Sequence, residues 1–464
     1  MLRRIFITIG YLVLAVFVAV ITVVLVAYGK DYSYDFATHR IIQKGHIILS
    51  SLPSGVEVFE GNRDLKKKTP YQAAYKVGAH TIRLVKDGYV AWQKTLLVEA
   101  GQVSLARYVI MMPKDLHPSA WDAKPQIVAQ SISKDHRHLA YITGGSDPAL
   151  YTLDTGDPKP VKLYTPKVAT PTVGAEVLQN VTWSDDASHL LVVSVVDGQP
   201  VHKLLPAGGG DPVNLTDQYR FNLSGMQFSG SNWRQLYWIS PDGLRRLDTD
   251  SQSVSAVLAD KVTQFWPERD RVLYVRQTEL GRSLWSVDGR GRHQELIQAL
   301  PESESYAVDY VSYQSHDELA VVPSRTQTGT LYTDIFSDTP TAKTVARGVT
   351  DVSFAPDGHL AVFSSPTSFT TYDLERSFLT GKSVYYTVND QPGQLSSLTW
   401  FDSYHLLLNR DGHLYWSEYD GANRVDLGLA SGDLPGYGSA DVKSVVMFKP
   451  DDQKVQLTQL HIRP

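Results

Sequence analysis

The sequence predicts a mainly β protein with one N-terminal transmembrane helix, a small β-sandwich-like domain and a large region of repeated short strands. Three observations lead to this prediction. An apolar run without charges spans residues 5–28, and short alternating apolar and polar stretches bounded by glycine and proline follow it. After residue 126 a strand–turn–strand pattern recurs at intervals of about 45 residues, in the range of known repeat architectures.

Length and composition narrow the function classes. A chain of 464 residues can bury a sizeable core and is long enough for more than one domain. Its formal net charge of -5 argues against nucleic acid as a partner. The absence of cysteine excludes disulfides, thiol catalysis and thiolate metal ligands.

The N-terminal run has the length and the flanking charges of a membrane anchor. A helix from Ile5 to Tyr28 would measure roughly 36 Å, enough to cross a hydrocarbon layer of ~30 Å with some tilt. Arg3 and Arg4 precede it, so we expect a cytoplasmic N-terminus and everything after Lys30 outside the cell. The alternative is a cleaved signal peptide, but its apolar segment is usually only ~7–15 residues long.

Residues 45–115 form the predicted small β domain, after a juxtamembrane linker at residues 31–44. Short strands alternate there with glycine and proline turns, and the stretch 78–92 has the pattern of a hairpin whose turn contains Asp87 and Gly88. We expect Gly88 to need a positive φ, which other residues resist.

The order of these features resembles the PEGA domain, a small β module of bacterial and archaeal surface proteins. The residues that carry the resemblance are Pro53, Ser54, Gly55, Val56, Gly61, Thr69, Pro70, Gly78, His80, Gly88 and Tyr89. Ser54 and Val56 replace the Glu and Ala of the motif that names the family, and a basic insertion at residues 63–68 replaces its short glycine turn. The resemblance implies a surface-exposed structural or binding module.

The basic run Lys66–Lys68 has two interpretations. It is either a solvated loop tip or a contact with anionic lipid or cell-wall polymer near the membrane.

From residue 116 to 464 the repeats predict a β-propeller of seven or eight blades. Eight copies of a strand–turn–strand pattern begin near residues 130, 181, 226, 263, 309, 351, 398 and 445. Several continue into a third and a fourth strand, and four short strands make one blade. The last copy ends after two strands, so either the segment near residues 105–126 completes an eighth blade or the ring has seven. The region resembles WD40-like and TolB-like propellers, and "FAPDGHLAVF" is the copy that fits best.

Six tryptophans fall within these predicted strands: Trp183, Trp238, Trp266, Trp285, Trp400 and Trp416. We expect them to pack between blades; the alternative is a stacking platform for carbohydrate.

No pattern in the chain indicates catalysis, a cofactor or a metal. "TGKS" at 380–383 lacks the first glycine of a phosphate loop, and "SISK" at 131–134 lacks its usual companion motifs. We expect His136 and His138 to be solvated, and Asp185 and Asp186 to be turn residues. We therefore expect no catalytic residues, no cofactor and no metal.

The candidate binding face is at one opening of the predicted ring. Connections that leave the outermost strand of a blade, and turns between second and third strands, surround the same opening. These include residues 217–222, 276–282, 323–329 and 433–438, and they carry the residue types that dominate binding sites. The candidate residues are Tyr219, Arg220, Arg276, Arg325 and Tyr437.

The favoured function is that of a non-enzymatic, membrane-anchored surface binding or scaffold protein. Its expected partners are the lipid bilayer, through the helix, and an extracellular protein, cell-wall polymer or glycan. Two alternatives stay open: a surface hydrolase or lyase acting on polysaccharide or peptide, and a structural subunit of an envelope complex.

Overall fold

The structure, a computed structural model, describes residues 2–36, 39–157, 159–171, 173–220, 225–230, 232–389, 393–432, 434–452 and 454–463. The chain divides into two compact units, Met1–Asp115 and Leu116–Ile462.

Helix α1 (Leu2–Gly29) opens the first unit. Its segment Ile9–Gly29 has a mean hydropathy of 3.0 and none of it is buried, and in the described part of the chain it is the one helix long and apolar enough to cross a membrane. This is compatible with a membrane anchor or a signal peptide. Strands β1 (Tyr32–Asp35) and β2 (Arg40–Gln43) then form a hairpin within the expected linker.

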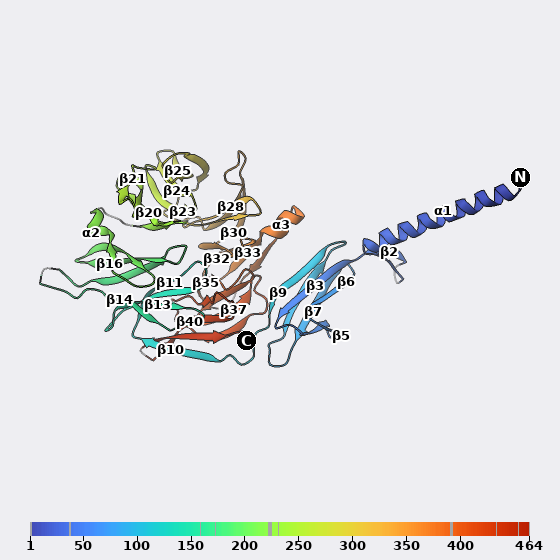
Figure 1. Cartoon of the computed structure of the whole chain (residues 1–464), viewed down its shortest axis with the longest axis horizontal. Helices are drawn as coiled ribbons and strands as arrows, with labels where there is room; N and C mark the ends of the chain where they lie inside the picture. Colours follow the sequence, from blue (N-terminus) through green and yellow to red (C-terminus); the bar gives the residue numbers. More distant parts are fainter. Residues whose placement is uncertain are drawn as a thin grey trace. The chain divides into compact units, whose positions relative to one another are not determined.

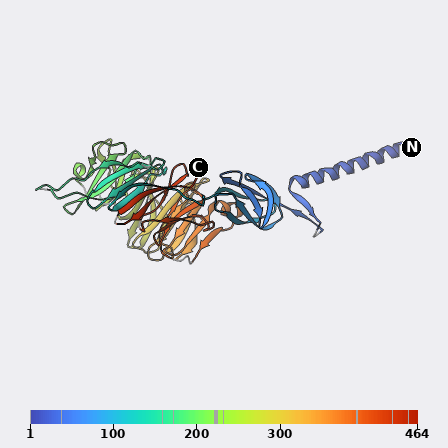
Figure 2. The same ribbon diagram turned by 90° about the horizontal axis from the view of Figure 1, so that it is seen from below.

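The rest of the first unit is a small two-sheet module, shown in blue in Figure 2. One sheet has the order β6-β3-β9 and the other β5-β4-β7-β8. The strands are β3 (Gly45–Leu52), β4 (Glu57–Glu60), β5 (Arg63–Lys68), β6 (Tyr71–Tyr75), β7 (Gly78–Val85), β8 (Trp92–Val98) and β9 (Val103–Ile110). Alternate residues of these strands point inward, and Ile47, Leu84 and Trp92 belong to the resulting core.

Two motif residues of this module have clear structural roles. Gly88 is the third residue of the turn between β7 and β8 and has a φ of +79°, as expected. Thr69 is 4% exposed, and its hydroxyl accepts a hydrogen bond from the Val56 N–H at 3.1 Å and contacts Ser51 Oγ at 2.6 Å. Thr69 therefore links the turn that precedes β4 to strand β3.

The basic run is not a loop tip, because it belongs to β5, a strand at the edge of its sheet. Lysines on an exposed edge oppose pairing with the strands of other molecules, so edge protection explains them without a ligand.

The second unit is a ring of four-stranded antiparallel sheets (Figure 1). Its described residues form eight such sheets, numbered here as blades one to eight in chain order. Blade one consists of β11 (Ile127–Ile132), β12 (His138–Thr143), β13 (Ala149–Asp154) and β14 (Val161–Tyr164). Blade two consists of β15 (Val177–Trp183), β16 (His189–Val196), β17 (Gln199–Pro206) and β18 (Val213–Asn214). Blade three consists of β19 (Gln227–Ser229), β20 (Asn232–Ser240), β21 (Gly243–Asp248) and β22 (Ser253–Val254).

Four further blades continue the same pattern. Blade four consists of β23 (Val262–Glu268), β24 (Arg271–Thr278), β25 (Gly281–Asp288) and β26 (Glu295–Leu300), and blade five of β27 (Tyr306–Tyr313), β28 (His316–Pro323), β29 (Thr328–Thr333) and β30 (Thr341–Arg347). Blade six consists of β31 (Asp351–Phe354), β32 (Leu360–Ser364), β33 (Phe369–Asp373) and β34 (Tyr385–Val388). Blade seven consists of β35 (Leu395–Trp400), β36 (His405–Arg410), β37 (His413–Glu418) and β38 (Val425–Leu429). Short helices α2 (Leu215–Tyr219) and α3 (Leu374–Thr380) lie in connections.

The eighth blade joins the two ends of the unit. Strands β39 (Tyr437–Gly438), β40 (Ser444–Asp451) and β41 (Lys454–His461) come from the C-terminal end, and β10 (Pro118–Lys124) completes the sheet from the N-terminal side. This answers the question left open by the sequence: the ring has eight blades, and the segment before blade one closes it. The fold is an eight-bladed β-propeller.

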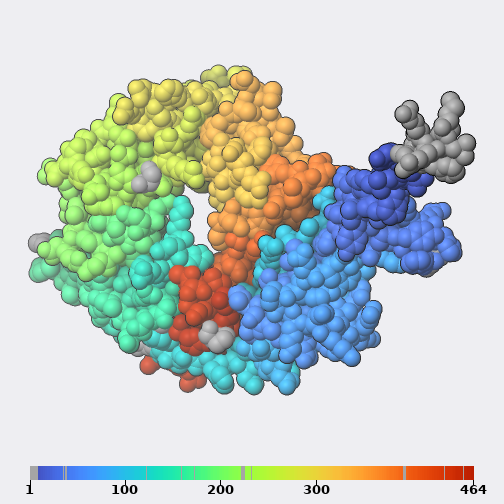
Figure 3. Space-filling view, turned by 45° about the vertical axis from the view of Figure 1, so that its right-hand side comes forward, coloured from blue at the N-terminus to red at the C-terminus, as the bar shows by residue number. Residues whose placement is uncertain are grey.

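The first strand of each blade faces the centre of the ring. Successive blades contact each other through these strands, as β11 does with β15 and β27 with β31. Figure 3 shows an opening at the centre of the ring.

Five of the six tryptophans pack between blades, as expected, and Trp416 stacks on His405 of its own blade with ring centroids 4.3 Å apart. Trp238 and Trp416 are each 1% exposed, Trp183 and Trp400 are also buried, and Trp266 and Trp285 are partly buried against core clusters.

The acidic residues of the strand–turn–strand repeats shape their turns. The side chain of Asp135 accepts a hydrogen bond from the Arg137 N–H at 3.0 Å, and that of Asp186 accepts one from the Ser188 N–H at 3.1 Å. Each also accepts a hydrogen bond from the serine two residues earlier, Ser133 or Ser184. The repeated Ser-x-Asp pattern is therefore a turn-forming element.

A buried acid in blade five makes stability depend on pH. Glu318 is 0% exposed and accepts a hydrogen bond from Thr333 Oγ1 at 2.9 Å, while its Oε1 has no partner among the described residues. Burial raises the pKa of Glu318 from 4.5 to about 7. The folded protein then keeps a proton on Glu318 that the unfolded chain has lost, so this group's stabilisation falls as the pH rises from about 4.5 to about 7.

We therefore expect Glu318→Gln, which cannot ionise, to raise the free energy of unfolding at pH 8 by about 1–3 kcal/mol and to have a much smaller effect at pH 4.5. Thermal or urea unfolding of both proteins at the two pH values measures this. An equal effect of the substitution at both pH values would contradict a protonated, buried Glu318.

Candidate binding face

The strand order assigns the predicted loops to one face of the ring. All blades begin in the same direction, so turns between second and third strands, and connections that leave fourth strands, share one face, here named the exit face. The predicted loops are the β18–β19 connection, the β24–β25 and β28–β29 turns and the β38–β39 connection. All four lie on the exit face, although they belong to different blades. Turns between first and second, and third and fourth, strands lie on the opposite, entry face.

Tyr219 and Arg220 end helix α2. Asn214 caps the helix at its start by accepting a hydrogen bond from the Asp217 N–H. Tyr219 packs, half-buried, against the core cluster that contains Leu215, and burial raises its pKa. Arg220 is exposed, has a φ of 53° and donates its N–H to the Thr216 carbonyl at 2.9 Å. The last two residues of this predicted loop, 221 and 222, lie outside the described residues.

Arg276 is already engaged by its own blade. Its guanidinium forms an ion pair with Asp260 and lies 5.3 Å from the ring centroid of Trp285. Only 22% of the side chain is exposed. Arg276 therefore supports the base of the β24–β25 hairpin.

Tyr437 corrects the prediction, because it lies in strand β39 and not in an exposed loop. It is 8% exposed and packs with Tyr141 and Phe448 in the core between blades eight and one. Burial raises the pKa of its hydroxyl far above the usual value of 10.0. Its role is packing of the ring.

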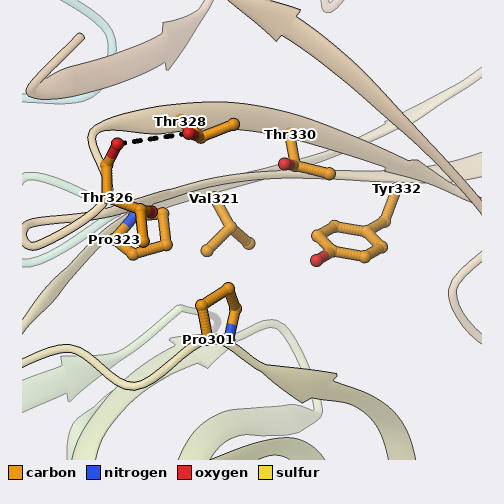
Figure 4. A pocket seen from close by; sticks show the side chains of 7 residues that line it. All are labelled: Pro301, Val321, Pro323, Thr326, Thr328, Thr330 and Tyr332. Atoms are coloured by element: carbon orange, nitrogen blue, oxygen red, sulfur yellow. Dashed lines mark hydrogen bonds between the residues drawn. The ribbon is translucent and has the colours of Figure 1, made fainter. Parts of the chain in front are cut away.

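Arg325 lies in the β28–β29 turn, which borders a pocket. The Arg325 side chain is exposed, and its backbone N–H donates to Ser303 Oγ at 3.0 Å. The pocket has a volume of about 180 Å³ and lies where blades four and five meet (Figure 4). Its lining residues are Pro301, Val321, Pro323, Thr326, Thr328, Thr330 and Tyr332.

The pocket combines apolar walls with hydroxyl groups. Pro301, Val321 and Pro323 provide apolar surface. Thr330 and Tyr332, whose side chains carry hydroxyl groups, line the same pocket next to Val321 (Figure 4). Tyr332 is 7% exposed, and within the described chain neither hydroxyl has a hydrogen-bond partner. Such a pocket is smaller than the ~300–1,000 Å³ of typical small-molecule sites, so it fits a single side chain or sugar ring of a larger ligand.

Hydrogen bonds fix the rim of this pocket. Ser303 Oγ lies 2.9 Å from Ser324 Oγ, and the Ser324 N–H donates to the Ser305 carbonyl at 2.9 Å. The Tyr306 hydroxyl donates to the Pro301 carbonyl at 2.5 Å. The two loops that form the pocket are therefore held together before any ligand arrives.

A fully exposed leucine stands next to the rim. Leu280 is at the tip of the β24–β25 hairpin. Arg282 follows it and pairs with Leu300, and its Nε lies 3.6 Å from Glu302 Oε2. The tip is thus adjacent to the loop that supplies Pro301. Leu280, Arg325 and the pocket form one surface, here named the blade-four/five surface.

The predicted loops 276–282 and 323–329 border this surface, but sequence reasoning singled out neither Leu280 nor the pocket. Pro301, Thr330 and Tyr332 are ordinary strand-end and strand residues, and only the packing of two blades brings them together. The exposed leucine in the turn "TELGR" was the one signal available.

The centre of the ring holds a separate group of charged residues. Lys134 Nζ and Asp185 Oδ2, in blades one and two, form an ion pair of 2.7 Å. Burial, reinforced by the charge of Asp309, raises the pKa of Glu268 in blade four to about 7. The charge of Asp185 raises this pKa further, and that of Lys134 lowers it. These charges come from opposite sides of the ring, so they meet across its centre. Burial also raises the pKa of Asp309 to about 6, although it accepts the N–H groups of Tyr310 and Phe354.

A larger hollow of about 560 Å³ on the entry face lies between blades one and two, and His138 and Trp183 line it with nine other residues. His138 is half-buried at this hollow and His136 is half-buried outside it, so neither is fully solvated, which corrects the sequence prediction. Burial lowers the pKa of His136. The charged groups at this hollow are already paired, Asp154 with Arg137 at 3.2 Å and Asp157 with Lys159 at 3.5 Å. Within the described residues no group of three or more His, Asp or Glu side chains could hold a metal ion.

Comparison with known proteins identifies the small domain. Residues 44–111 match the PEGA domain family, so the chain contains a PEGA domain, as the sequence motifs indicated. Comparison with curated protein sequences gives no match.

Several solved structures are similar to the chain. The Dos1 propeller has a TM-score of 0.49 at 10% identity and covers 74% of this chain and 94% of its own. An oligogalacturonate lyase from Vibrio parahaemolyticus has a TM-score of 0.43 at 10% identity and covers 75% and 97%. An oligogalacturonate lyase in complex with manganese has a TM-score of 0.41 at 16% identity and covers 74% and 98%. At these scores the strand pairing of the chain itself carries the fold assignment, and the chain combines a PEGA domain with a β-propeller.

The different placements of Tyr437 and Arg325 predict different effects of alanine. Tyr437→Ala should lower the free energy of unfolding by about 3 kcal/mol, because it leaves a cavity between two blades. Arg325→Ala should change it by less than about 0.5 kcal/mol, because the side chain is exposed. Urea unfolding followed by tryptophan fluorescence tests both. A stable Tyr437→Ala protein would place this residue outside the core.

Proposed function

We propose that this protein is a membrane-anchored, non-enzymatic binding or scaffold protein that presents its propeller outside the cell. The blade-four/five surface supports the proposal most directly. There a fully exposed leucine, an exposed arginine and a pocket with a fixed rim lie together. Exposed apolar side chains next to a preformed pocket are typical of protein and glycan binding sites.

In this proposal the propeller binds an extracellular protein, a cell-wall polymer or a glycan. Leu280 and the pocket provide the apolar anchors. The hydroxyls of Thr330 and Tyr332 hydrogen-bond one group of the ligand inside the pocket, and Arg325 contacts polar groups at the edge.

A surface hydrolase or lyase is the second candidate, and the residues at the ring centre favour it. A carboxyl with a pKa of about 7, such as Glu268, can donate and accept protons near neutral pH. An enzyme of this kind would release soluble fragments from a polysaccharide or peptide polymer, whereas a binding protein would retain the polymer intact.

Orientation is the first test. Arg3 and Arg4 precede the apolar run of α1, so protease added to intact cells should digest the propeller, while an epitope tag placed before Arg3 should survive. The control is the same treatment after the membrane has been permeabilised, which should remove both. A propeller protected in intact cells would refute a location outside the cell.

Binding is tested with two matched variants of the full chain in detergent. Leu280→Asp changes the fully exposed leucine of the exit face, and Leu379→Asp changes a leucine that is 79% exposed in α3, a connection between third and fourth strands on the entry face. Retention on isolated cell-wall material, and on immobilised envelope proteins, is measured for each. We expect Leu280→Asp to weaken retention by about tenfold or more, equivalent to about 1.4 kcal/mol, and Leu379→Asp to leave it unchanged.

Tyr332→Phe refines the same experiment, because it removes the pocket hydroxyl and keeps the ring. It should weaken retention without lowering the unfolding midpoint. If Leu379→Asp weakens retention as much as Leu280→Asp, or if neither does, the blade-four/five surface is not the binding site.

A further inference from the structure

The β1–β2 hairpin, directly after α1, has its aromatic side outward. In the register of the hairpin, Tyr34 pairs with Ile41 and Tyr32 with Gln43, so these side chains share one face. Phe36 continues this face at the turn, and its ring packs edge-on against Tyr34 with centroids 5.0 Å apart.

The aromatic face is exposed, whereas a hairpin packed onto a soluble domain turns such side chains inward. Phe36 is 81% exposed, Ile41 73%, Tyr34 49% and Tyr32 41%. Ser33 and its cross-strand partner Ile42, on the other face, are half-buried. In water a small domain gains stability by turning aromatic residues inward, so an exposed aromatic face needs a partner.

The position of the hairpin in the chain indicates which partner. Tyr32 is three residues beyond Gly29, the end of α1, so an extended chain places it at most about 10 Å from the helix end. The polar layer of a bilayer extends about 5–7 Å beyond the hydrocarbon on each side. If α1 spans the membrane, the hairpin therefore begins within or beside this layer.

Hydrogen bonds hold both ends of the hairpin at the helix end. The Lys44 N–H donates to the Asp31 carbonyl at 2.9 Å, and Gln43 Nε2 donates to the Lys30 carbonyl at 3.1 Å. Asp31 also forms an ion pair of 2.8 Å with His46 at the start of the PEGA domain. The returning strand thus cannot carry the aromatic face far from the helix.

We propose that the β1–β2 hairpin is a membrane-interface element whose aromatic face lies in the headgroup layer of the bilayer. Tyr32 and Tyr34 place their rings in the interface with their hydroxyls among the headgroups, as tyrosine does at the ends of membrane spans. Phe36 and Ile41 enter the boundary with the acyl chains. The proposal requires α1 to stay attached as an anchor, but it does not depend on what the propeller binds.

The absence of cysteine allows a direct test with the full chain. Ile41→Cys, Ser33→Cys and Leu280→Cys each give one site for a nitroxide spin label: on the aromatic face, on the opposite face and on an exposed propeller turn. The labelled proteins are reconstituted in vesicles of phosphatidylcholine and phosphatidylglycerol. Relaxation of the label by oxygen, which concentrates in lipid, is compared with relaxation by a water-soluble nickel complex.

We expect the ratio of oxygen to nickel relaxation at position 41 to be severalfold higher than at position 280, with position 33 between them. Adding Tyr34→Ser and Phe36→Ser to Ile41→Cys should lower the ratio toward that of position 280, because the face then loses its apolar anchors. Flotation with the vesicles shows that the anchor is present.

Three outcomes would overturn the proposal. Equal ratios at positions 41 and 280 in protein that floats would place the aromatic face in water. A label at position 41 that is immobilised and shielded from both reagents would place it against protein. Failure of the chain to float would also overturn it, through loss of the anchor, and would leave the results for the blade-four/five surface unaffected.

Discussion

The pairing of β10 with β41 is the constraint on which the propeller depends. Pro118 pairs with Leu460 and Lys124 with Val455, so a strand from the start of the unit completes the sheet at its end. Without β10, β41 would present a row of unpaired backbone groups at an open edge. Gln459 of β41 extends the closure, because its Nε2 donates to the Thr155 carbonyl of blade one at 3.1 Å. The ring can therefore open only by breaking contacts between distant parts of the chain.

Closure of the ring makes the exit face suitable for binding, because it keeps loops from different blades in fixed positions relative to one another. Polar links between blades add to this rigidity. Glu176, 5% exposed, accepts hydrogen bonds from Lys203 of blade two and from Tyr164 of blade one, at 2.5 and 2.6 Å. These bonds lower the pKa of Glu176 to about 2, although burial alone would raise it. Removing one partner would leave a buried charge unpaired, so such links specify how the blades fit together.

Local patterns were predictable from the sequence, whereas features made by distant segments were not. The apolar run, the PEGA motif and the Ser-x-Asp turns depend on neighbouring residues, and the structure confirms the helix, the domain and the turns. The number of blades was not predictable, because β10 is not a copy of the repeat. Tyr437 was misplaced because β39 has only two residues, too few to show alternation. The pocket at Tyr332 combines two blades, and no local pattern reports such a contact.

The exit face and the centre of the ring differ in the kind of recognition they support. On the exit face some charges are already balanced within the protein, as in the pairs of Arg276 with Asp260 and Arg245 with Asp242. The blade-four/five surface offers a ligand the apolar Leu280, the pocket hydroxyls and the exposed Arg325. The interactions of the apolar and hydroxyl groups depend little on salt or pH. At the centre of the ring, Glu268 and Asp309 change charge near neutral pH, so binding or chemistry there would follow the pH. Binding that varies little with pH would therefore indicate the exit face, and binding that changes near neutral pH would indicate the centre of the ring, whatever the partner is.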